Sequence, residues 1–431
     1  MMEQINILVF PCGSEIGLEL HRALKDIRFI TLYGASSADD HGKSVYKNYI
    51  GGVPYISDPG FIDEINRVVD ENGIKFIFPA LDSVIAFLSA NRDKLHAELL
   101  TSPDEAVQIC RSKEKTYKKL EGCLFLPGVY ACADDVPGYP VIIKPSEGQG
   151  SQGFMIIKSR EELDYELSQR TDPQVICEYL PGEEYTIDCF TDRHGKLRFA
   201  SCRNRHRIRN GISVNSTLMP PDDNIREIAE TINKKMELRG VWFFQLKRNT
   251  SGEYRLLECA TRVAGTMCLE RAAGVNLALL TVFDALGYEL DIPEPLSSAT
   301  VDRALYNVFS LGLDYDEVYM DYDDTLIVKN RVNFTVLRFI YQCVERNIRV
   351  VLLTRHETDV REDMQEFRIF PGLFDEIICI PRSEKKIDHI SPSENALFID
   401  DSFAERDAVR RAFGVTALGV DAVEALIDER Q

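Results

Sequence analysis

Two aspartates, Asp321 and Asp323, stand one residue apart near the C-terminus, directly after the apolar run 317–320. Such a run is typical of a buried strand, and side chains two positions apart on a strand project from the same face. Two carboxylates on one face can hold a divalent cation, attack a phosphoryl group and exchange protons with a leaving group. The spacing therefore indicates phosphoryl chemistry at the end of a strand.

The region after these aspartates supplies more polar residues at matching places. Buried-strand patterns at 348–354 and 396–401 both end in polar side chains, and two lysines precede a helical pattern between them. The residues concerned are Thr354, Lys385, Lys386, Asp400 and Asp401. Ligands gather at the carboxyl ends of the strands in a parallel sheet, so we expect Thr354, Asp400 and Asp401 to lie there together with Asp321 and Asp323.

A second phosphate-handling pattern lies upstream, in the glycine-rich stretch 147–153. Glycines let backbone N–H groups approach phosphate oxygens closely, and Lys144, which ends the preceding strand pattern, can reach a phosphate as a point charge. The small residues of the stretch are Gly148, Gly150, Ser151 and Gly153.

Segments that follow could complete a nucleotide site. The stretch 178–185 comes after a buried strand, where backbone groups can bind an adenine edge and a carboxylate can bind ribose hydroxyls. Gln245 and Glu258 are predicted at the ends of successive strands, where they could share a Mg²⁺ ion. Arg262 follows four residues after Glu258.

Every second residue from Arg203 to Arg209 is an arginine. One interpretation is an exposed strand or loop whose charges pair with surface carboxylates. The other is a clamp for the γ-phosphate or for a substrate carboxylate, because guanidinium groups match both anions. The sequence leaves open which arginine points inward.

The elements that must position these residues change along the chain. Residues 5–110 alternate strand-like segments (5–10 and 75–79) with helical ones (15–25 and from Asp82 on), which predicts a mostly parallel sheet. Residues 111–310 hold short strands joined by tight turns, which favours antiparallel pairing. Residues 316–431 again alternate strand-like and helical segments. The boundary near 311–316 is short, so we expect the domains on its two sides to touch.

The order of the upstream parts resembles the ATP-grasp superfamily, particularly the carboxylate–amine ligases similar to carbamoyl-phosphate synthase, over roughly residues 1–310. The stretches 13–17 and 79–83 look like the α/β domain that precedes the ATP-grasp fold. The stretch 112–116 resembles the segment that carries the first phosphate-binding lysine.

The resemblance implies a role for each motif residue in ATP binding. Lys113 and Lys144 would bind phosphates, and the stretch 147–153 would be the mobile loop over the triphosphate. Glu184 would hold the ribose. The adenine hinge would be formed by Glu178, Tyr179 and Leu180.

Metal binding and acyl transfer follow from the same resemblance. Gln245 and Glu258 would be Mg²⁺ ligands, and Arg262 would steady an acyl phosphate. The chain departs from the family in one place, since it has Ala260 where the family usually has an asparagine ligand. Alanine cannot ligate a cation, which puts the second Mg²⁺ in doubt and leaves a non-catalytic ATP-grasp scaffold as an alternative.

The C-terminal set resembles the haloacid dehalogenase superfamily over residues 316–431, with all four motifs matched. The resemblance implies that Asp321 is the nucleophile that forms an aspartyl-phosphate and that Asp323 is the general acid and base. Thr354 would bind the phosphoryl group. Lys385 or Lys386 would neutralise its charge, with Lys386 favoured because it lies one turn before Ile390. The Mg²⁺ site would contain Asp321, Asp323, Asp400 and Asp401.

The intervals between these motifs are short. Few residues separate Thr325 from the helix expected near Asn333, and one helix and one strand fill the interval from Thr354 to Lys385. Neither interval has room for a folded cap domain. We therefore expect an open phosphatase site, which accepts a bulky substrate or uses the ligase domain as its lid.

Composition limits the number of domains, the partners and the compartment of the chain. The 431 residues exceed the usual size of one domain, and the net charge of −19 argues against binding to nucleic acid or anionic membranes. Eleven scattered cysteines, without a CxxC pair, indicate reduced thiols and a cytoplasmic location. No segment has the length and apolar character of a transmembrane span.

The sequence thus predicts a multidomain α/β and α+β chain with three domains. They are a pre-ATP-grasp α/β domain (1–110), an ATP-grasp domain (111–312) and a capless, Rossmann-like haloacid dehalogenase domain (313–431). The predicted protein joins a carboxylate to an amine with ATP and Mg²⁺ and hydrolyses a phosphomonoester; homodimerisation stays open. Two alternatives are a small-molecule kinase combined with a phosphatase, and a phosphatase that carries a regulatory ATP-binding module.

Overall fold

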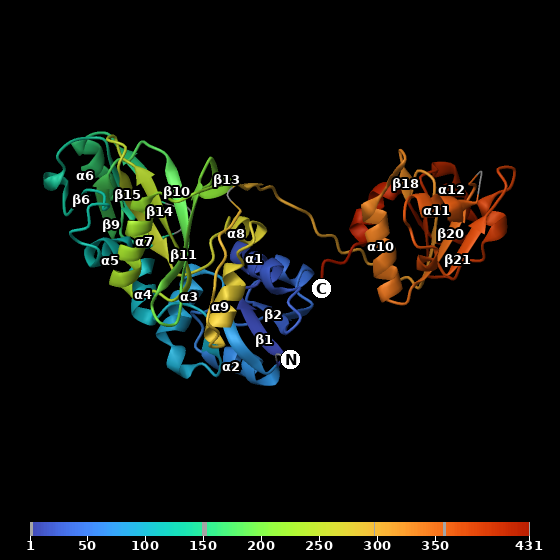
Figure 1. Ribbon diagram of the computed structural model, residues 1–431, viewed down its shortest axis with the longest axis horizontal. Coiled ribbons are helices and arrows are strands. Elements are labelled where there is room, and N and C mark those ends of the chain that lie inside the picture. The colour runs from blue at the N-terminus through green and yellow to red at the C-terminus, as the bar shows by residue number, and fades with distance from the viewer. Residues whose placement is uncertain (1–2, 149–152, 297, 357–358, 431) are drawn as a thin grey trace. The chain divides into compact units, whose positions relative to one another are not determined.

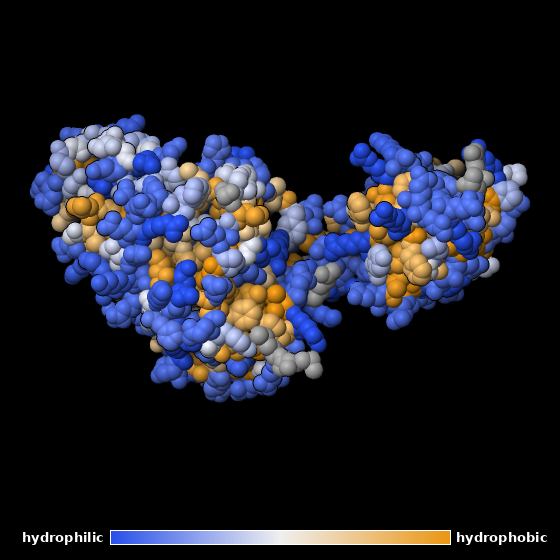
Figure 2. Space-filling model, in the orientation of Figure 1, coloured by the Kyte–Doolittle hydropathy of each residue, from blue (hydrophilic) through white to orange (hydrophobic). Residues whose placement is uncertain are grey.

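The computed structural model describes residues 3–148, 153–296, 298–356 and 359–430. The chain forms two compact units, one running to Leu305 and the other from Tyr306 to Glu429 (Figure 1). Polar residues cover most of the visible face of each unit (Figure 2). Among the described helices, none is both long and apolar enough to cross a bilayer. All eleven cysteines are free thiols.

The first unit begins with the parallel sheet that the sequence predicts. Its five strands lie in the order β3-β2-β1-β4-β5 and all pair in parallel. Alternate residues of each strand face opposite sides, so the odd-numbered apolar residues of β1 pack with α1 while Leu8 and Phe10 pack with α2. The bounds are β1 Ile5–Phe10, β2 Ile30–Ser36, β3 Asn48–Gly51, β4 Ile74–Pro79, β5 Glu98–Leu99, α1 Glu15–Leu24, α2 Phe61–Glu71 and α3 Asp82–Ala90.

The next part of this unit contains a small antiparallel sheet, in the order β6-β9-β7-β8. Strands β7 and β8 flank the glycine-rich stretch. Gly153 has φ +72°, and a Cβ added there would lie 2.8 Å from the ring of Pro145, so glycine is required on both counts. The bounds are α4 Asp104–Arg111, α5 Lys113–Lys119, β6 Val129–Tyr130, β7 Val141–Pro145, β8 Met155–Ile157, α6 Arg160–Ser168 and β9 Gln174–Glu178.

A larger antiparallel sheet completes the first unit. Its strands lie in the order β12-β13-β11-β10-β14-β15, and β16 pairs with β13. One face packs against α7 around the buried Trp242, the single tryptophan of the chain. The bounds are β10 Glu184–Thr191, β11 Leu197–Asn204, β12 Arg207–Arg209, β13 Ile212–Met219, α7 Asp223–Met236, β14 Gly240–Arg248, β15 Tyr254–Ala260, α8 Cys268–Ala272, α9 Leu277–Ala285 and β16 Thr300–Asp302.

The second unit is a five-stranded parallel sheet in the order β21-β20-β17-β22-β23, with α10, α11 and α12 beside it (Figure 1). Val318 and Met320 of β17 pack with α10, and Tyr319 packs on the opposite face with α12. The bounds are β17 Glu317–Met320, β18 Ile327–Val328, β19 Arg331–Val332, α10 Phe334–Glu345, β20 Arg349–Thr354, α11 Val360–Glu366, β21 Glu376–Cys379, β22 Ala396–Ile399, α12 Phe403–Phe413 and β23 Thr416–Leu418.

The boundary between the units is longer than the sequence suggested. Instead of a short junction at 311–316, residues 303–315 contain neither helix nor strand. Leu305 is 99% exposed and Phe309 is 43% exposed, so apolar residues that could have indicated a packed element remain in solvent. The division of the first unit between residues 110 and 111 stays a prediction.

Candidate active sites

The first unit contains a cavity of about 330 Å³ that gathers most of the nucleotide residues expected from the sequence. Apolar side chains, including Ile142, Phe154 and Leu256, form part of its wall. The expected residues that line it are Lys113, Lys144, Gly148, Glu178, Tyr179, Leu180, Glu184, Gln245 and Glu258. Gly153 does not line it, and Gly150 and Ser151 lie outside the described residues.

The two lysines reach the cavity from different elements. Lys113 is the first residue of α5, whose N-terminus is capped by the hydroxyl of Ser112. Burial lowers the pKa of the Lys113 ammonium, and the Glu258 carboxylate opposes this effect. Lys144 lies in β7 and is buried, and its Nζ donates to the hydroxyl of Tyr117 at 2.9 Å and to the carbonyl of Leu257 at 3.3 Å.

The expected hinge lies at the end of β9. Oε2 of Glu178 accepts a hydrogen bond from the backbone N–H of Gly128 at 3.1 Å and lies 3.7 Å from Nε of Arg255. The side chain of Glu178 is therefore engaged beside the cavity. Leu180 is buried at 3% exposure and forms part of the wall.

Arg205 is the inward-pointing member of the arginine-rich stretch in this cavity. Its Nη1 donates to Glu184 and, at 2.7 Å, to Oε1 of Gln245, and its Nη2 donates to the carbonyl of Gly211 at 2.7 Å. Its side chain is 7% exposed, and Nε is buried without a hydrogen-bond partner among the described residues. Arg203 is buried as well and forms two hydrogen bonds with Asp188. The stretch is thus divided between inward and outward side chains, since Arg207 and Arg209 are exposed.

Gln245 and Glu258 lie opposite each other on the neighbouring strands β14 and β15. They are directly paired in the β14–β15 ladder, and both lie inside their strands, which corrects the expectation that they sit at strand ends. Residues directly opposite in an antiparallel pair have Cβ atoms about 4.5–5.5 Å apart. Both side chains can therefore contribute oxygen atoms to one cation.

A second cavity, of about 340 Å³, adjoins the first and shares several of its lining residues. The shared residues are Arg205, Gly211, Gln245 and Glu258. Arg262 lines it and is held by Asp82, whose Oδ2 accepts from Nη2 at 2.9 Å. Asp82 begins α3, shortly after β4 of the parallel sheet, and Arg262 follows β15 of the large antiparallel sheet, so the ends of the two sheets meet here.

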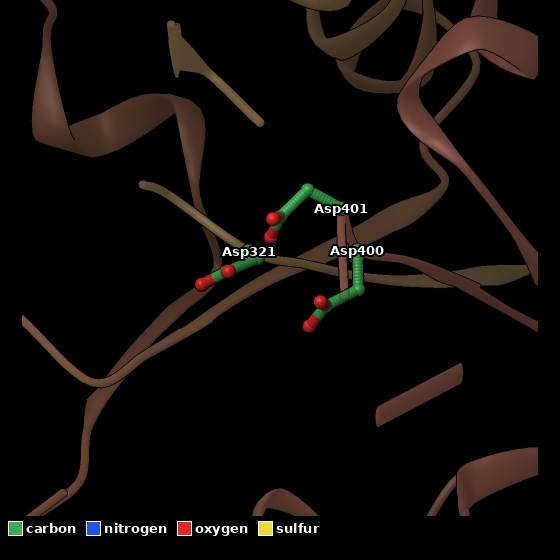
Figure 3. A group of neighbouring side chains, drawn as sticks. All are labelled: Asp321, Asp400 and Asp401. Atoms are coloured by element: carbon green, nitrogen blue, oxygen red, sulfur yellow. The ribbon is translucent and has the colours of Figure 1, made fainter. Parts of the chain in front are cut away.

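The second unit brings three carboxylates together at the carboxyl ends of β17 and β22. Ligand oxygens of Asp321, Asp400 and Asp401 all lie within 4.8 Å of one another (Figure 3). Asp321 and Asp400 are buried, and Asp401 is exposed. An all-oxygen donor set with one exposed member fits Mg²⁺, which retains part of its water shell.

Lys386 lies against this group. Its Nζ is 2.8 Å from Oδ1 of Asp321 and 2.6 Å from Oδ2 of Asp400, and its side chain is 3% exposed. Lys385 is exposed, so the structure separates the two lysines by burial. The expected helix here is a four-residue 3₁₀ turn, Lys386–His389. Burial raises the pKa of Asp321 to about 6 although the Lys386 ammonium opposes the shift.

Thr354 ends β20 and is completely buried, and its hydroxyl has no hydrogen-bond partner among the described residues. A buried orphan hydroxyl at a strand end is suited to an oxygen-rich ligand. Asp323 does not belong to the group of three carboxylates in the described part of the chain. Instead, its Oδ2 lies 2.9 Å from Nδ1 of His356.

One comparison with known proteins is placed along the chain, and it lies within the first unit. A family model described as ATP-grasp in the biosynthetic pathway with Ter operon matches residues 170–304. The biotin carboxylase domain of Hydrogenobacter thermophilus 2-oxoglutarate carboxylase, solved with MgADP and bicarbonate, superposes with a TM-score of 0.56 at 17% identity, covering 67% of this chain and 71% of that one. N5-carboxyaminoimidazole synthetase from Staphylococcus aureus, solved with ADP, gives a TM-score of 0.58 at 14% identity, covering 71% and 83%. The first unit has the ATP-grasp fold.

A curated relative of the chain is the arginine-specific large chain of carbamoyl phosphate synthase from Bacillus subtilis. It is 24% identical over 232 residues, which make up 49% of this chain and 22% of that protein. This chain thus spans about a fifth of the relative's length.

The residues of the ATP-grasp unit fit a nucleotide and its metal. Apolar walls suit a base, two lysines suit phosphates, and Gln245 beside Glu258 supplies oxygen ligands. Ala260 lies in β15 two residues after Glu258 and offers no such ligand.

Reasoning from the sequence missed Tyr117 and His356. A signal for Tyr117 was available, since it follows Lys113 by four residues in a helix and shares its face. His356 lies two residues after Thr354, but sequence spacing alone gave no partner for it.

Proposed function

We propose that the chain is a bifunctional enzyme. Its ATP-grasp unit joins a carboxylate to an amine through an acyl phosphate, and its second unit hydrolyses a phosphomonoester through an aspartyl-phosphate. The cofactors are ATP and Mg²⁺. The observation that carries the ligase half is the pair of adjoining cavities that share Arg205, Gln245 and Glu258. A nucleotide in one cavity and an acid in the other would meet at these residues.

In the proposed ligase reaction, the chain's own residues bind and orient the reactants. Lys113 and Lys144 bind the phosphates, and the backbone of the hinge from Glu178 to Leu180 faces the base. Arg262, fixed by Asp82, steadies the acyl phosphate until the amine attacks its carbonyl carbon and inorganic phosphate leaves. Mg²⁺ held by Gln245 and Glu258 would polarise the terminal phosphate. Glu184 is assigned to the ribose, for which it must exchange its contact with Arg205.

The proposed phosphatase belongs to the haloacid dehalogenase type, without a cap domain. Asp321 attacks phosphorus, Thr354 binds a phosphoryl oxygen and Lys386 offsets its charge. Asp323 protonates the leaving oxygen and then deprotonates the attacking water. Mg²⁺ bound by Asp321, Asp400 and Asp401 would lower the repulsion between the nucleophile and the phosphate. The support is the convergence of these carboxylates with a buried lysine and a buried orphan hydroxyl.

The intervals around the proposed phosphatase site are filled by small elements. The interval after Asp323 contains the two-residue strands β18 and β19, and α11 and β21 lie between β20 and Lys386. These lengths support an open site. The proposed domain limits remain 1–110, 111–312 and 313–431.

The ligase half is tested by measuring ADP release with amino acids and small carboxylic acids offered singly and in pairs. We expect release that requires both an acid and an amine, and no release from Glu258→Gln. Release that needs only one acceptor would instead indicate a small-molecule kinase. Ala260 favours a further candidate, a regulatory nucleotide-binding module, which would bind ATP in an equilibrium assay and release no ADP with any pair.

The phosphatase half is tested with aryl phosphates. Asp321→Asn should remove hydrolysis and leave ADP release unchanged. Full hydrolysis by Asp321→Asn would contradict the assignment of the nucleophile.

A further inference from the structure

Asp323 is in contact with His356, a residue to which the proposed function gives no role. Oδ2 of Asp323 lies 2.9 Å from Nδ1 of His356, within hydrogen-bond distance. The side chain of Asp323 is 52% exposed, whereas that of His356 is 14% exposed. An exposed carboxylate is thus in contact with a mostly buried ring.

The ring of His356 is held by packing against a buried side chain. It packs edge-on against the ring of Tyr322, with centroids 5.4 Å apart and an interplanar angle of 84°. Tyr322 is completely buried, and its hydroxyl donates to Oδ2 of Asp363 in α11 at 2.7 Å. A series of contacts therefore runs from α11 through Tyr322 and His356 to Asp323.

We infer that His356 is a positioning residue that holds the carboxyl group of Asp323 in the orientation needed for proton transfer. The inference rests on the proposed phosphatase function, in which Asp323 is the general acid and base. An aspartate at 52% exposure is free to adopt several rotamers in solvent. A hydrogen bond to an anchored imidazole selects among these rotamers, and proton transfer depends on such alignment.

His356 neither gains nor loses a proton in the proposed reaction. When Asp321 attacks, the bond between phosphorus and the leaving oxygen breaks, and that oxygen takes the proton of the Asp323 carboxyl group. In the second step the Asp323 carboxylate takes a proton from water as the water oxygen attacks phosphorus, which frees Asp321 and inorganic phosphate. His356 keeps the Asp323 carboxyl group in place through both steps.

The test measures kcat/KM, which reports the steps up to release of the phenol, for a series of aryl phosphates that differ in the pKa of that phenol. A poor leaving group needs the proton from Asp323 more than a good one does. His356→Ala should therefore lower kcat/KM about tenfold or more for the poorest leaving groups, with little loss for the best; complete loss of general acid catalysis costs about 10²–10⁴-fold. His356→Asn should restore much of the rate, because its side-chain amide can donate from nearly the same place as Nδ1.

The variant Asp323→Asn provides the reference. Adding His356→Ala to Asp323→Asn should cost little more, since a residue that acts through Asp323 has nothing left to position. Equal losses for all leaving groups, failure of His356→Asn to restore the rate, or an additive double variant would each overturn the inference. Activity that persists in Asp321→Asn would instead overturn the proposed phosphatase, which separates the two failures.

Discussion

Replacing Lys386 by methionine should destabilise the second unit strongly. Lys386 is 3% exposed and its Nζ lies 2.8 Å from Asp321 and 2.6 Å from Asp400. Without it, the two buried carboxylates lose the ammonium group that both of them contact. Methionine has a similar shape, so the change removes charge with little loss of volume.

The size of the effect follows from these distances. Two carboxylate charges up to 4.8 Å apart repel by at least about 3.5 kcal/mol at an effective dielectric constant of about 20. Breaking a buried ion pair by removing one partner costs about 3–5 kcal/mol in known cases. We expect a loss in this range near neutral pH. The loss should be smaller at about pH 5, where one carboxylate can take a proton, and smaller when Mg²⁺ is added.

The assay follows hydrogen exchange in the full chain, at the amides of β17 and β22, with increasing urea. Trp242, the single tryptophan, lies in the ATP-grasp unit, so its fluorescence reports whether that unit stays unaffected. The matched control is Lys385→Met, which removes an exposed charge next to Lys386 and should change stability by no more than about 0.5 kcal/mol. Equal stability of the two variants, or a loss for Lys386→Met that does not depend on pH, would refute the reasoning.

Three further predictions concern metal binding and pH. Burial raises the pKa of Asp321 to about 6, so protons should compete with Mg²⁺ below that pH and the Kd measured by calorimetry should rise by up to about tenfold per pH unit; an invariant Kd would count against Asp321 as a ligand. Ala260→Asn should lower the Mg²⁺ concentration for half-maximal ADP release by supplying an amide oxygen, whereas an unchanged requirement would argue against a ligand position there. Burial, reinforced by Asp188, raises the pKa of Glu270, which means the native state binds its proton more tightly than the unfolded state does. The resulting stability is complete below about pH 4.5 and falls as the pH rises toward the native pKa, so Glu270→Gln should raise the urea midpoint at about pH 8 more than at about pH 5; equal shifts at both pH values would exclude this explanation.

Strand and helix positions could be predicted where the apolar pattern was regular. The alternating segments of residues 5–110 form the parallel sheet, and Asp321 lies at a strand end as its spacing predicts. The choice between Lys385 and Lys386 depended on which side of a short 3₁₀ turn faces the sheet. Adjacent residues on so short an element look alike in sequence, and burial distinguishes them.

Contacts between residues far apart in the sequence could not be predicted for the candidate sites. The four arginines along 203–209 stand at alternate positions, so the pattern treats them alike. It cannot tell that Arg205 meets Glu184 and Gln245, which lie 21 and 40 residues away. The pairing of Gln245 with Glu258 likewise depends on strand register. Both residues lie inside β14 and β15, because these strands continue beyond the apolar segments from which their ends were predicted.

Arg205 has a thermodynamic consequence for the two cavities that it lines. Its guanidinium group donates hydrogen bonds to Glu184, Gln245 and the carbonyl of Gly211. An anion that binds this group from one cavity therefore changes the hydrogen bonds that the group can donate to a ligand in the other cavity. Binding linkage is reciprocal: if occupancy of the first cavity alters affinity in the second, the converse holds by the same factor. The order in which two reactants enter would then be an energetic preference set by one side chain, and Arg205→Met should make their affinities independent of each other.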